Sequence, residues 1–275
     1  MAIVLAAAVM HAGWNALVKS GGDKLVDITL ITTGAALVAA PALFIAPPPA
    51  PASWPYIAAS VVIHCAYFLL AGLTYRHGDL SFAYPLMRGS APLVTAMVSV
   101  ALLGEELGAG GWTGVVLLSL GVLALTRDNW RSGHLQGRAA AFGLANTAVI
   151  VVYTLVDGVG VRLAGNAWSY VVWLFFLNAV PLLLVMLVAN GSALLPAARR
   201  GWRTAFAGGA LTLGAYGLVL WAMTQAPIAL VAALRETSVI FGVAIASLLL
   251  KERFGATRWT AAVLVAAGAA AMKVT

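Results

Sequence analysis

The sequence contains few charged residues and a single cysteine. Only 9% of its 275 residues are Asp, Glu, Lys or Arg, whereas soluble domains carry about 25%, so the chain cannot cover a water-soluble particle of this size. The lone Cys65 excludes an intramolecular disulfide framework. Hydrophobic residues make up 62% of the chain and the mean hydropathy is +0.97, which excludes intrinsic disorder. These features predict an all-α polytopic membrane protein.

The excess of basic residues does not indicate nucleic-acid binding. The formal net charge is +7, but the Lys and Arg residues are scattered through short loops between apolar runs and form no continuous basic face. The first apolar run begins at Met1, lacks a basic leading segment and contains Trp14, Asn15 and Lys19. We therefore interpret it as a first membrane-spanning helix and not as a cleaved signal peptide.

The chain divides into apolar segments of about the length needed to span a bilayer, which takes about 20 residues in a helix. The connections between them are short and leave no room for a soluble domain. Ten segments are predicted, namely Ala2–Val18, Val26–Ala46, Trp54–Thr74, Ser81–Leu103, Gly111–Thr126, Arg138–Gly160, Ala167–Ala189, Trp202–Thr224, Ile228–Leu250 and Ala256–Met272.

The second half of the chain repeats the first. Shifting Asp79–Thr126 by 147 positions aligns it with Ala226–Lys273 without a gap, and 12 of 48 residues are identical. The identical pairs include Arg88 with Arg235, Glu105 with Glu252, Gly108 with Gly255, Trp112 with Trp259, Thr113 with Thr260, and Gly121 with Gly268. Because five helices is an odd number, the second repeat enters the membrane from the opposite side, which predicts two inverted five-helix repeats. We accordingly divide the chain into a first repeat at 1–127, a polar connection at 128–137 and a second repeat at 138–275.

The distribution of basic residues predicts an orientation. The loops after the first, third, fifth, seventh and ninth segments hold twelve Lys and Arg residues, whereas the opposite side holds only Arg162 and Lys273. The positive-inside rule then places both termini outside the cytoplasm.

Two stretches carry the motifs of a known family. Gly78–Glu106 and Pro227–Phe254 contain "LLGE" and "LLKE" endings, each followed by Trp-Thr and then a glycine. With these motifs the whole chain resembles the EamA-type proteins of the drug/metabolite transporter superfamily. The resemblance implies ten helices in two five-helix repeats and a transport function, and it leaves the substrate undefined. It also implies termini inside the cytoplasm, opposite to the prediction from loop charge.

Two shorter stretches resemble the four-helix small multidrug resistance proteins. Met10–Lys19 (MHAGWNALVK) is similar to their first helix, and Ala83–Gly89 (AYPLMRG) to the start of their fourth. In this comparison His11 falls where those proteins carry their essential glutamate, and Met87 where they carry a substrate-stacking tryptophan. The two replacements argue against cation/proton antiport by that carboxylate.

Two arginines lie at equivalent positions inside the predicted spanning segments. An ionisable group costs about 3 kcal/mol in a membrane, so Arg88 and Arg235 are expected to face a cavity or a partner. Each lies about 10 Å deep at 1.5 Å per residue, and a bilayer core of about 30 Å leaves them about 10 Å apart along the membrane normal. Such a pair can bind a carboxylate, phosphate or phosphonate. The alternative is structural neutralisation, for Arg235 by Glu236 or Asp157.

Two acids and a histidine are candidates for binding or coupling. Glu236 is expected to bind a substrate amine or to balance charge, with its partner on another helix, because residues i and i+1 do not face each other. Asp157 and His11 are candidates for proton coupling, since a carboxylate can carry a proton and histidine titrates near physiological pH. Hydrogen-bonded packing is the alternative for His11.

Aromatic and amide side chains complete the predicted substrate site. Trp14 and Asn15 lie within about one helical turn of His11, and Tyr84 and Tyr216 are flanked by polar or small residues. Aromatic walls would suit an ammonium group through cation–π attraction, although membrane aromatics also form interfacial belts.

Other repeated residues are expected to be architectural. Glu105 and Glu252 each precede a predicted helix, and an acid favours a helix N-terminus. Small residues are expected to let helices pack closely, and these are Gly114, Gly121, Ala261 and Gly268.

These features predict a secondary active transporter in the bacterial inner membrane. Its expected substrate is a small organic metabolite with an anionic group, such as an amino acid or similar zwitterion, moved by alternating access with proton or exchange coupling. Efflux of cationic drugs and flipping of a lipid-linked headgroup are the alternatives. An enzyme is disfavoured because no catalytic constellation stands out. The sequence has no GxxxxGK[ST], HExxH or CxxC motif, so we expect no metal or other cofactor. The expected partners are the substrate and the lipid bilayer, with a homodimer left open.

Overall fold

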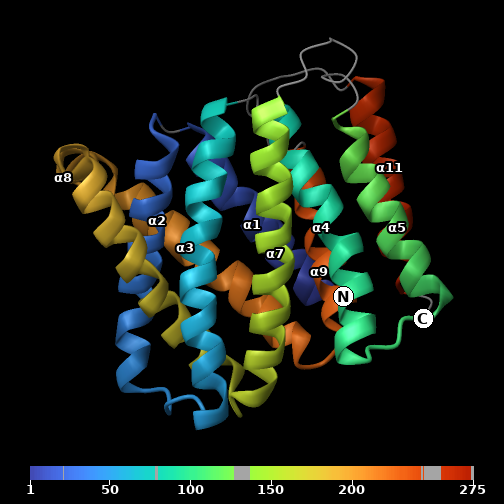
Figure 1. Ribbon diagram of the computed structural model, residues 1–275, viewed down its shortest axis with the longest axis horizontal. Helices are drawn as coiled ribbons and strands as arrows, with labels where there is room; N and C mark the ends of the chain where they lie inside the picture. The colour runs from blue at the N-terminus through green and yellow to red at the C-terminus, as the bar shows by residue number, and fades with distance from the viewer. Residues whose placement is uncertain (21, 78–79, 127–136, 243, 245–254, 274–275) are drawn as a thin grey trace.

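The chain folds as a bundle of helices in the computed structural model (Figure 1). The structure describes residues 1–275 except 21, 78–79, 127–136, 243, 245–254 and 274–275, and for residues 19–20 and for the rest of 75–84 it describes the backbone alone. Within these ranges every regular element is a helix.

The helices follow the predicted apolar segments in order. The helix ends differ from the predicted ends by three residues or fewer, apart from the two differences described below. The elements are α1 (Ala2–Ser20), α2 (Lys24–Ala39, continued by a 3₁₀ turn at Ala40–Phe44), α3 (Trp54–His77, preceded by a 3₁₀ turn at Pro51–Ser53), α4 (Leu80–Leu103), α5 (Ala109–Ala124), α7 (Gly137–Leu163), α8 (Ala167–Met223), α9 (Ile228–Arg235) and α11 (Ala256–Ala271).

The helices have the length and surface expected for a bilayer. Among the described residues, five helical stretches are long and apolar enough to cross a membrane, and α1, α5 and α11 are shorter apolar helices. Large apolar side chains point outward, for example Val62, Val188 and Val263, whose exposed fractions are 69%, 91% and 62%. Both faces of these helices are therefore apolar, one packed in the bundle and one suited to lipid.

Helix α8 differs from the sequence prediction. The predicted connection at 190–201 is helical, and the only non-helical backbone inside α8 is at Asn190 (φ −154°, ψ 39°). The prediction of a loop here is wrong because residues 191–201 are rich in Ala, Leu and Arg, which favour helix. A straight helix of this length would measure about 85 Å at 1.5 Å per residue, so the kink divides α8 into two segments, seen at the left of Figure 1.

The predicted helix Ile228–Leu250 is interrupted. α9 ends at Arg235, Glu236 and Thr237 form a turn, and helical backbone resumes at Ser238. Across the turn the amide N–H groups donate three residues back, as from Glu236 to the Ala233 carbonyl and from Thr237 to the Leu234 carbonyl. A tight 3₁₀ stretch inside a helix often marks a hinge. The later part of the predicted segment lies largely outside the described residues.

Helices from the two halves of the chain pack against each other. α2 lies against α8, α3 against α7, and α5 against α11. At the α5–α11 contact, a Cβ added to Gly114 would lie 2.7 Å from the Gly268 carbonyl oxygen, and one added to Gly268 would lie 2.8 Å from the Gly114 carbonyl oxygen. Gly121 and Ala261 are buried in the same contact. The prediction that small residues allow close packing here is confirmed.

Candidate functional site

Arg88, Arg235 and Glu236 form a buried ion cluster. Arg88 lies on α4, and the other two lie where α9 ends. The Arg88 Nε is 2.8 Å from Glu236 Oε2, and the Arg235 Nε is 3.6 Å from Glu236 Oε1. None of the three side chains is more than 4% exposed. One carboxylate therefore lies between two guanidinium groups, and the three ionised groups carry one net positive charge.

His11 extends this cluster onto α1. Its Nε2 lies 3.2 Å from Arg88 Nη2, and its Nδ1 lies 3.1 Å from the indole Nε1 of Trp14. Guanidinium and indole N–H groups only donate hydrogen bonds, whereas a neutral imidazole accepts through one nitrogen. One of the two contacts is therefore not a hydrogen bond in this arrangement. The side-chain amide of Asn15 donates to the His11 carbonyl oxygen at 2.8 Å, so it bonds its own helix.

Asp157 on α7 accepts hydrogen bonds from two tyrosines of α8. The Tyr170 hydroxyl donates to Oδ1 at 2.9 Å, and the Tyr216 hydroxyl donates to Oδ2 at 2.6 Å. The Asp157 side chain is fully buried, and neutral donors satisfy both of its oxygens. Because the two tyrosines lie on either side of the kink at Asn190, Asp157 holds both segments of α8 against α7.

Tyr153 connects the two clusters. The Arg235 guanidinium carbon lies 6.0 Å from the centre of its ring, at the limit of cation–π range. The same ring is 6.2 Å from the ring of Tyr216 and 4.4 Å from that of His64. Tyr153 and Asp157 are four residues apart on α7 and so share a helix face. Helices α1, α3, α4, α7, α8 and α9 thus contribute side chains to one central polar region.

The structure brings most of the predicted site residues together. His11, Trp14, Arg88, Arg235 and Glu236 are in direct contact as described, and Asp157 and Tyr216 lie in the adjoining cluster. The side chain of Tyr84 lies outside the described part of the chain.

Two predictions about Glu236 and the arginines have different outcomes. The expectation that Glu236 pairs with another helix is confirmed by Arg88 on α4. Its contact with the adjacent Arg235 is the neutralisation that was the alternative for Arg235, and it forms because the regular helix ends between the two residues. The predicted separation of about 10 Å along the normal counted backbone depth alone, whereas the long side chains reach one shared carboxylate.

Sequence reasoning missed Tyr170 and did not select Tyr153. Tyr170 stands near the start of a spanning segment, where an aromatic residue is typical of the membrane interface, so no signal pointed to Asp157. Tyr153 could have been found from its four-residue spacing from Asp157.

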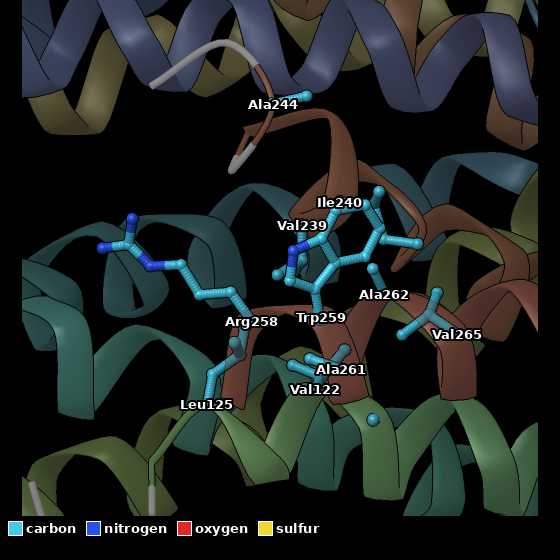
Figure 2. Close-up of a pocket in the computed structure, with 11 residues that line it drawn as sticks. Val122, Leu125, Val239, Ile240, Ala244, Arg258, Trp259, Ala261, Ala262 and Val265 are labelled. Atoms are coloured by element: carbon cyan, nitrogen blue, oxygen red, sulfur yellow. The ribbon is translucent and has the colours of Figure 1, made fainter. Parts of the chain in front are cut away.

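Two cavities in the described part of the chain are lined by residues outside this cluster. One, of about 160 Å³, lies between α5, α11 and the segment after the α9 break. Figure 2 shows that its labelled lining is apolar apart from Arg258, including Val122, Ile240 and Trp259. The other, of about 320 Å³, is lined by polar groups at the α7–α8 and α8–α9 connections, including Arg162.

Glu105 caps α9 from the other half of the chain. Its Oε1 accepts from the Ile228 amide at 2.7 Å and from Arg162 Nη2 at 2.8 Å, and its Oε2 accepts from the Ala229 amide at 3.2 Å. Arg162 Nε also donates to the Met223 carbonyl at 2.8 Å. These contacts satisfy N–H groups at a helix N-terminus, where a negative charge is favourable.

The prediction that Glu105 is architectural is confirmed, but the helix that it stabilises is α9 and not the helix that follows it. α5 begins after Gly108 without a side-chain cap, and the carboxylate instead reaches the N-terminus of α9. Glu252, its counterpart in the repeat, lies outside the described residues.

We expect Glu105→Ala to lower the free energy of unfolding by about 1–3 kcal/mol, because buried donors lose their acceptor. Glu105 is 7% exposed in its side chain, whereas the next residue, Glu106, is exposed and gives a matched control. Glu106→Ala should change stability by no more than about 0.5 kcal/mol. Unfolding of both purified variants in detergent measures the difference, and equal losses would contradict the cap.

Two comparisons with known proteins indicate the family. The EamA-like transporter family matches residues 137–273. A protein of Bacillus atrophaeus named "Multidrug resistance protein EbrA" is 35% identical over 78 residues, which cover 28% of this chain and 71% of the relative. The protein of the same name from Bacillus subtilis (strain 168) is 32% identical over 77 residues, covering 28% and 70%.

A solved crystal structure shares the whole fold. It superposes with a TM-score of 0.79, covers 99% of this chain and 96% of its own, and is 16% identical in sequence. Together with the apolar helical bundle, these matches show that the chain belongs to the EamA-like transporters of the drug/metabolite transporter superfamily, whose members are integral multi-pass membrane transporters.

Proposed function

We propose that this chain is a secondary active transporter for a small organic metabolite that carries an anionic group, such as an amino acid. The observation that carries the proposal is the pair of buried arginines at equivalent repeat positions, which converge on a single carboxylate. Buried charges in a membrane protein are costly and normally serve a pathway or a partner. Two guanidinium groups with one acid between them have capacity for a further anion.

The proposed mechanism is alternating access by two inverted repeats, 1–127 and 138–275, joined by the connection at 128–137. Ten spanning helices would follow from this arrangement. The contact of α5 with α11, which occupy the same place in the two repeats, supports it. So does the contact of α4 with α9, which carry the two arginines. Transporters of this kind hold their substrate at the repeat interface near the middle of the membrane.

Protons are proposed to couple through His11 or Asp157. A proton added to neutral His11 turns both ring nitrogens into donors, so Arg88 and Trp14 would have to withdraw from the ring. A proton added to Asp157 replaces an acceptor by a donor and so changes the bonds to the α8 tyrosines. Either event changes contacts between helices, which is what coupling to alternating access requires. Trp14, Asn15 and Tyr216 are proposed to line the substrate path beside them.

The proposed location is the bacterial inner membrane. Loop charge supports termini outside the cytoplasm.

Replacing either arginine tests the function directly. We expect Arg88→Gln and Arg235→Gln to reduce uptake of the transported metabolite into proteoliposomes by about 10- to 150-fold, because a charge-assisted bond to a buried anion contributes about 1.5–3 kcal/mol. A panel of radiolabelled amino acids, phosphonates and organic cations identifies the metabolite with the native chain. Arg203→Gln is the matched control, since Arg203 is exposed on α8. Native rates in both cluster variants would refute the proposal.

Efflux of cationic drugs is the second candidate function. The names of the two Bacillus relatives favour it. It predicts uptake of organic cations alone, with loss of transport in Asp157→Asn or Glu236→Gln and little effect of the arginine variants. The same panel therefore separates the two functions.

A further inference from the structure

The space between the two arginines is occupied by the chain itself. Glu236 places its carboxylate against Arg88 on one side and Arg235 on the other. The Glu236 carboxylate is the shared partner of both guanidinium groups, and none of the three side chains is more than 4% exposed. A solute anion that paired with both guanidinium groups in the same way would have to replace this carboxylate.

The contacts of Glu236 are unequal. The Arg88 pair, at 2.8 Å, has the length of a charge-assisted contact, whereas the Arg235 pair, at 3.6 Å, is longer than a hydrogen bond. The Arg235 side chain is nevertheless only 4% exposed. A buried guanidinium held this loosely is suited to exchange its partner.

The backbone at Glu236 is also suited to movement. The residue ends α9 and begins the turn at Glu236–Thr237. The turn is held by bonds to the third preceding residue, and the Thr237 hydroxyl donates to the Leu234 carbonyl at 2.7 Å. A small change in this turn would redirect Glu236 while α9 stays capped by Glu105 at its other end.

We propose that Glu236 is a tethered substitute for the carboxylate of the transported solute: it fills the arginine pair in the empty transporter, and the solute displaces it. The proposal rests on the function proposed above and narrows its substrate class. Once displaced, the Glu236 carboxylate can pair with an ammonium group of the same solute. A zwitterion has no net charge, so the net charge of the buried cluster stays unchanged when it binds. The favoured solute is therefore a zwitterion with adjacent carboxylate and ammonium groups.

The thermal midpoint of the purified full chain in detergent, titrated with sodium acetate, tests the displacement. Acetate reproduces the end of the Glu236 side chain and does not depend on knowing the solute. We expect acetate to raise the midpoint of Glu236→Gln at a concentration at least about tenfold lower than for the native chain, because a neutral amide competes less for the arginines. Sodium chloride at equal ionic strength and methylammonium chloride should not reproduce the shift.

Two further variants keep the test decisive. Glu236→Asp retains the charge but shortens the side chain. The acetate concentration that raises its thermal midpoint should therefore lie between those of the native chain and Glu236→Gln. This variant also provides a test if Glu236→Gln folds poorly. Glu105→Gln neutralises a different buried acid and should respond as the native chain does. If the same acetate concentration raises the thermal midpoint of the native chain, Glu236→Asp and Glu236→Gln, Glu236 is a fixed counter-ion and the proposal is overturned.

The outcomes also separate this inference from the proposed function. If acetate stabilises all variants equally, the arginines bind anions and only the displacement fails. If acetate stabilises none of them, the anion site fails, and the proposed function with it.

Glycine tests the ammonium pairing. Glycine should stabilise the native chain at a lower concentration than acetate, and Glu236→Gln should reverse that order because the ammonium group loses its partner. A native chain that prefers acetate to glycine would overturn the assignment of a zwitterion.

Discussion

Glu236→Gln is expected to destabilise the protein more than Arg88→Gln or Arg235→Gln. Removing Glu236 leaves two buried cations without the acid they share, whereas removing one arginine leaves the other still paired with Glu236. Breaking a buried ion pair by removing one partner costs about 3–5 kcal/mol, and Glu236→Gln should reach or exceed the upper end of that range. Arg88→Gln and Arg235→Gln should each lower the free energy of unfolding by about 3 kcal/mol or less.

Double variants provide the internal check. Arg88→Gln/Glu236→Gln and Arg235→Gln/Glu236→Gln each leave one unpaired cation in place of two, so each should be more stable than Glu236→Gln alone. Unfolding in detergent measures these differences, and Arg203→Gln controls for loss of an arginine on the surface. If Glu236→Gln proves the mildest of the three single variants, Glu236 is not the shared counter-ion.

The ion cluster shows how far residue identity alone predicts a site. A charged residue is rare in an apolar segment, so Arg88, Arg235, Glu236 and Asp157 stand out in the sequence, and the repeat pairs the two arginines. The partners of these residues depend on how far each side chain reaches and on where a helix ends. Residue identity indicates neither. The contact of Glu236 with its neighbour required a helix end that the continuous apolar run of 228–250 concealed.

The partners of Asp157 illustrate the same limit. Tyr170 and Tyr216 belong to one helix but lie 46 positions apart across the kink at Asn190, so no spacing rule connects them to α7. The cap of α9 by Glu105 likewise joins residues more than 120 positions apart. The lengths and composition of the apolar segments predicted the helices, because a helix depends on residues that are close in the sequence. Contacts between helices depend on how the whole bundle packs.

Because Arg88 and Arg235 are buried, their pairing with Glu236 bears on the proposed transport cycle. A transporter that rocks between two states must carry its central charges through both, and an unpaired buried cation would oppose the movement. Glu236 is the anionic partner of both guanidinium groups, and in the proposed cycle the solute carboxylate takes its place. Net movement of the empty carrier would thus depend on Glu236, whereas exchange of solute for solute would not.

The crossing of α2 and α8 is where a single methyl group is expected to have the largest effect on packing. A Cβ added to Gly209 would fall against the backbone of Gly34 and Ala35, and one added to Gly34 would fall against the backbone of Ala205. Backbone atoms cannot yield as a flexible side chain can. Gly209→Ala should therefore lower the free energy of unfolding by about 1–3 kcal/mol, and Gly209→Leu by more.

Gly201 on the same helix provides the matched control for Gly209. A Cβ added there would meet nothing within 4 Å, and Ala is favoured over Gly inside a helix by up to about 1 kcal/mol. Gly201→Ala should therefore leave stability unchanged or raise it, whereas Gly209→Ala should lower it. Equal gains in both variants would mean that α2 and α8 do not cross at backbone contact. Because this crossing joins the two halves of the chain, loss of stability at Gly209 alone would show that their close contact contributes to the stability of the whole bundle.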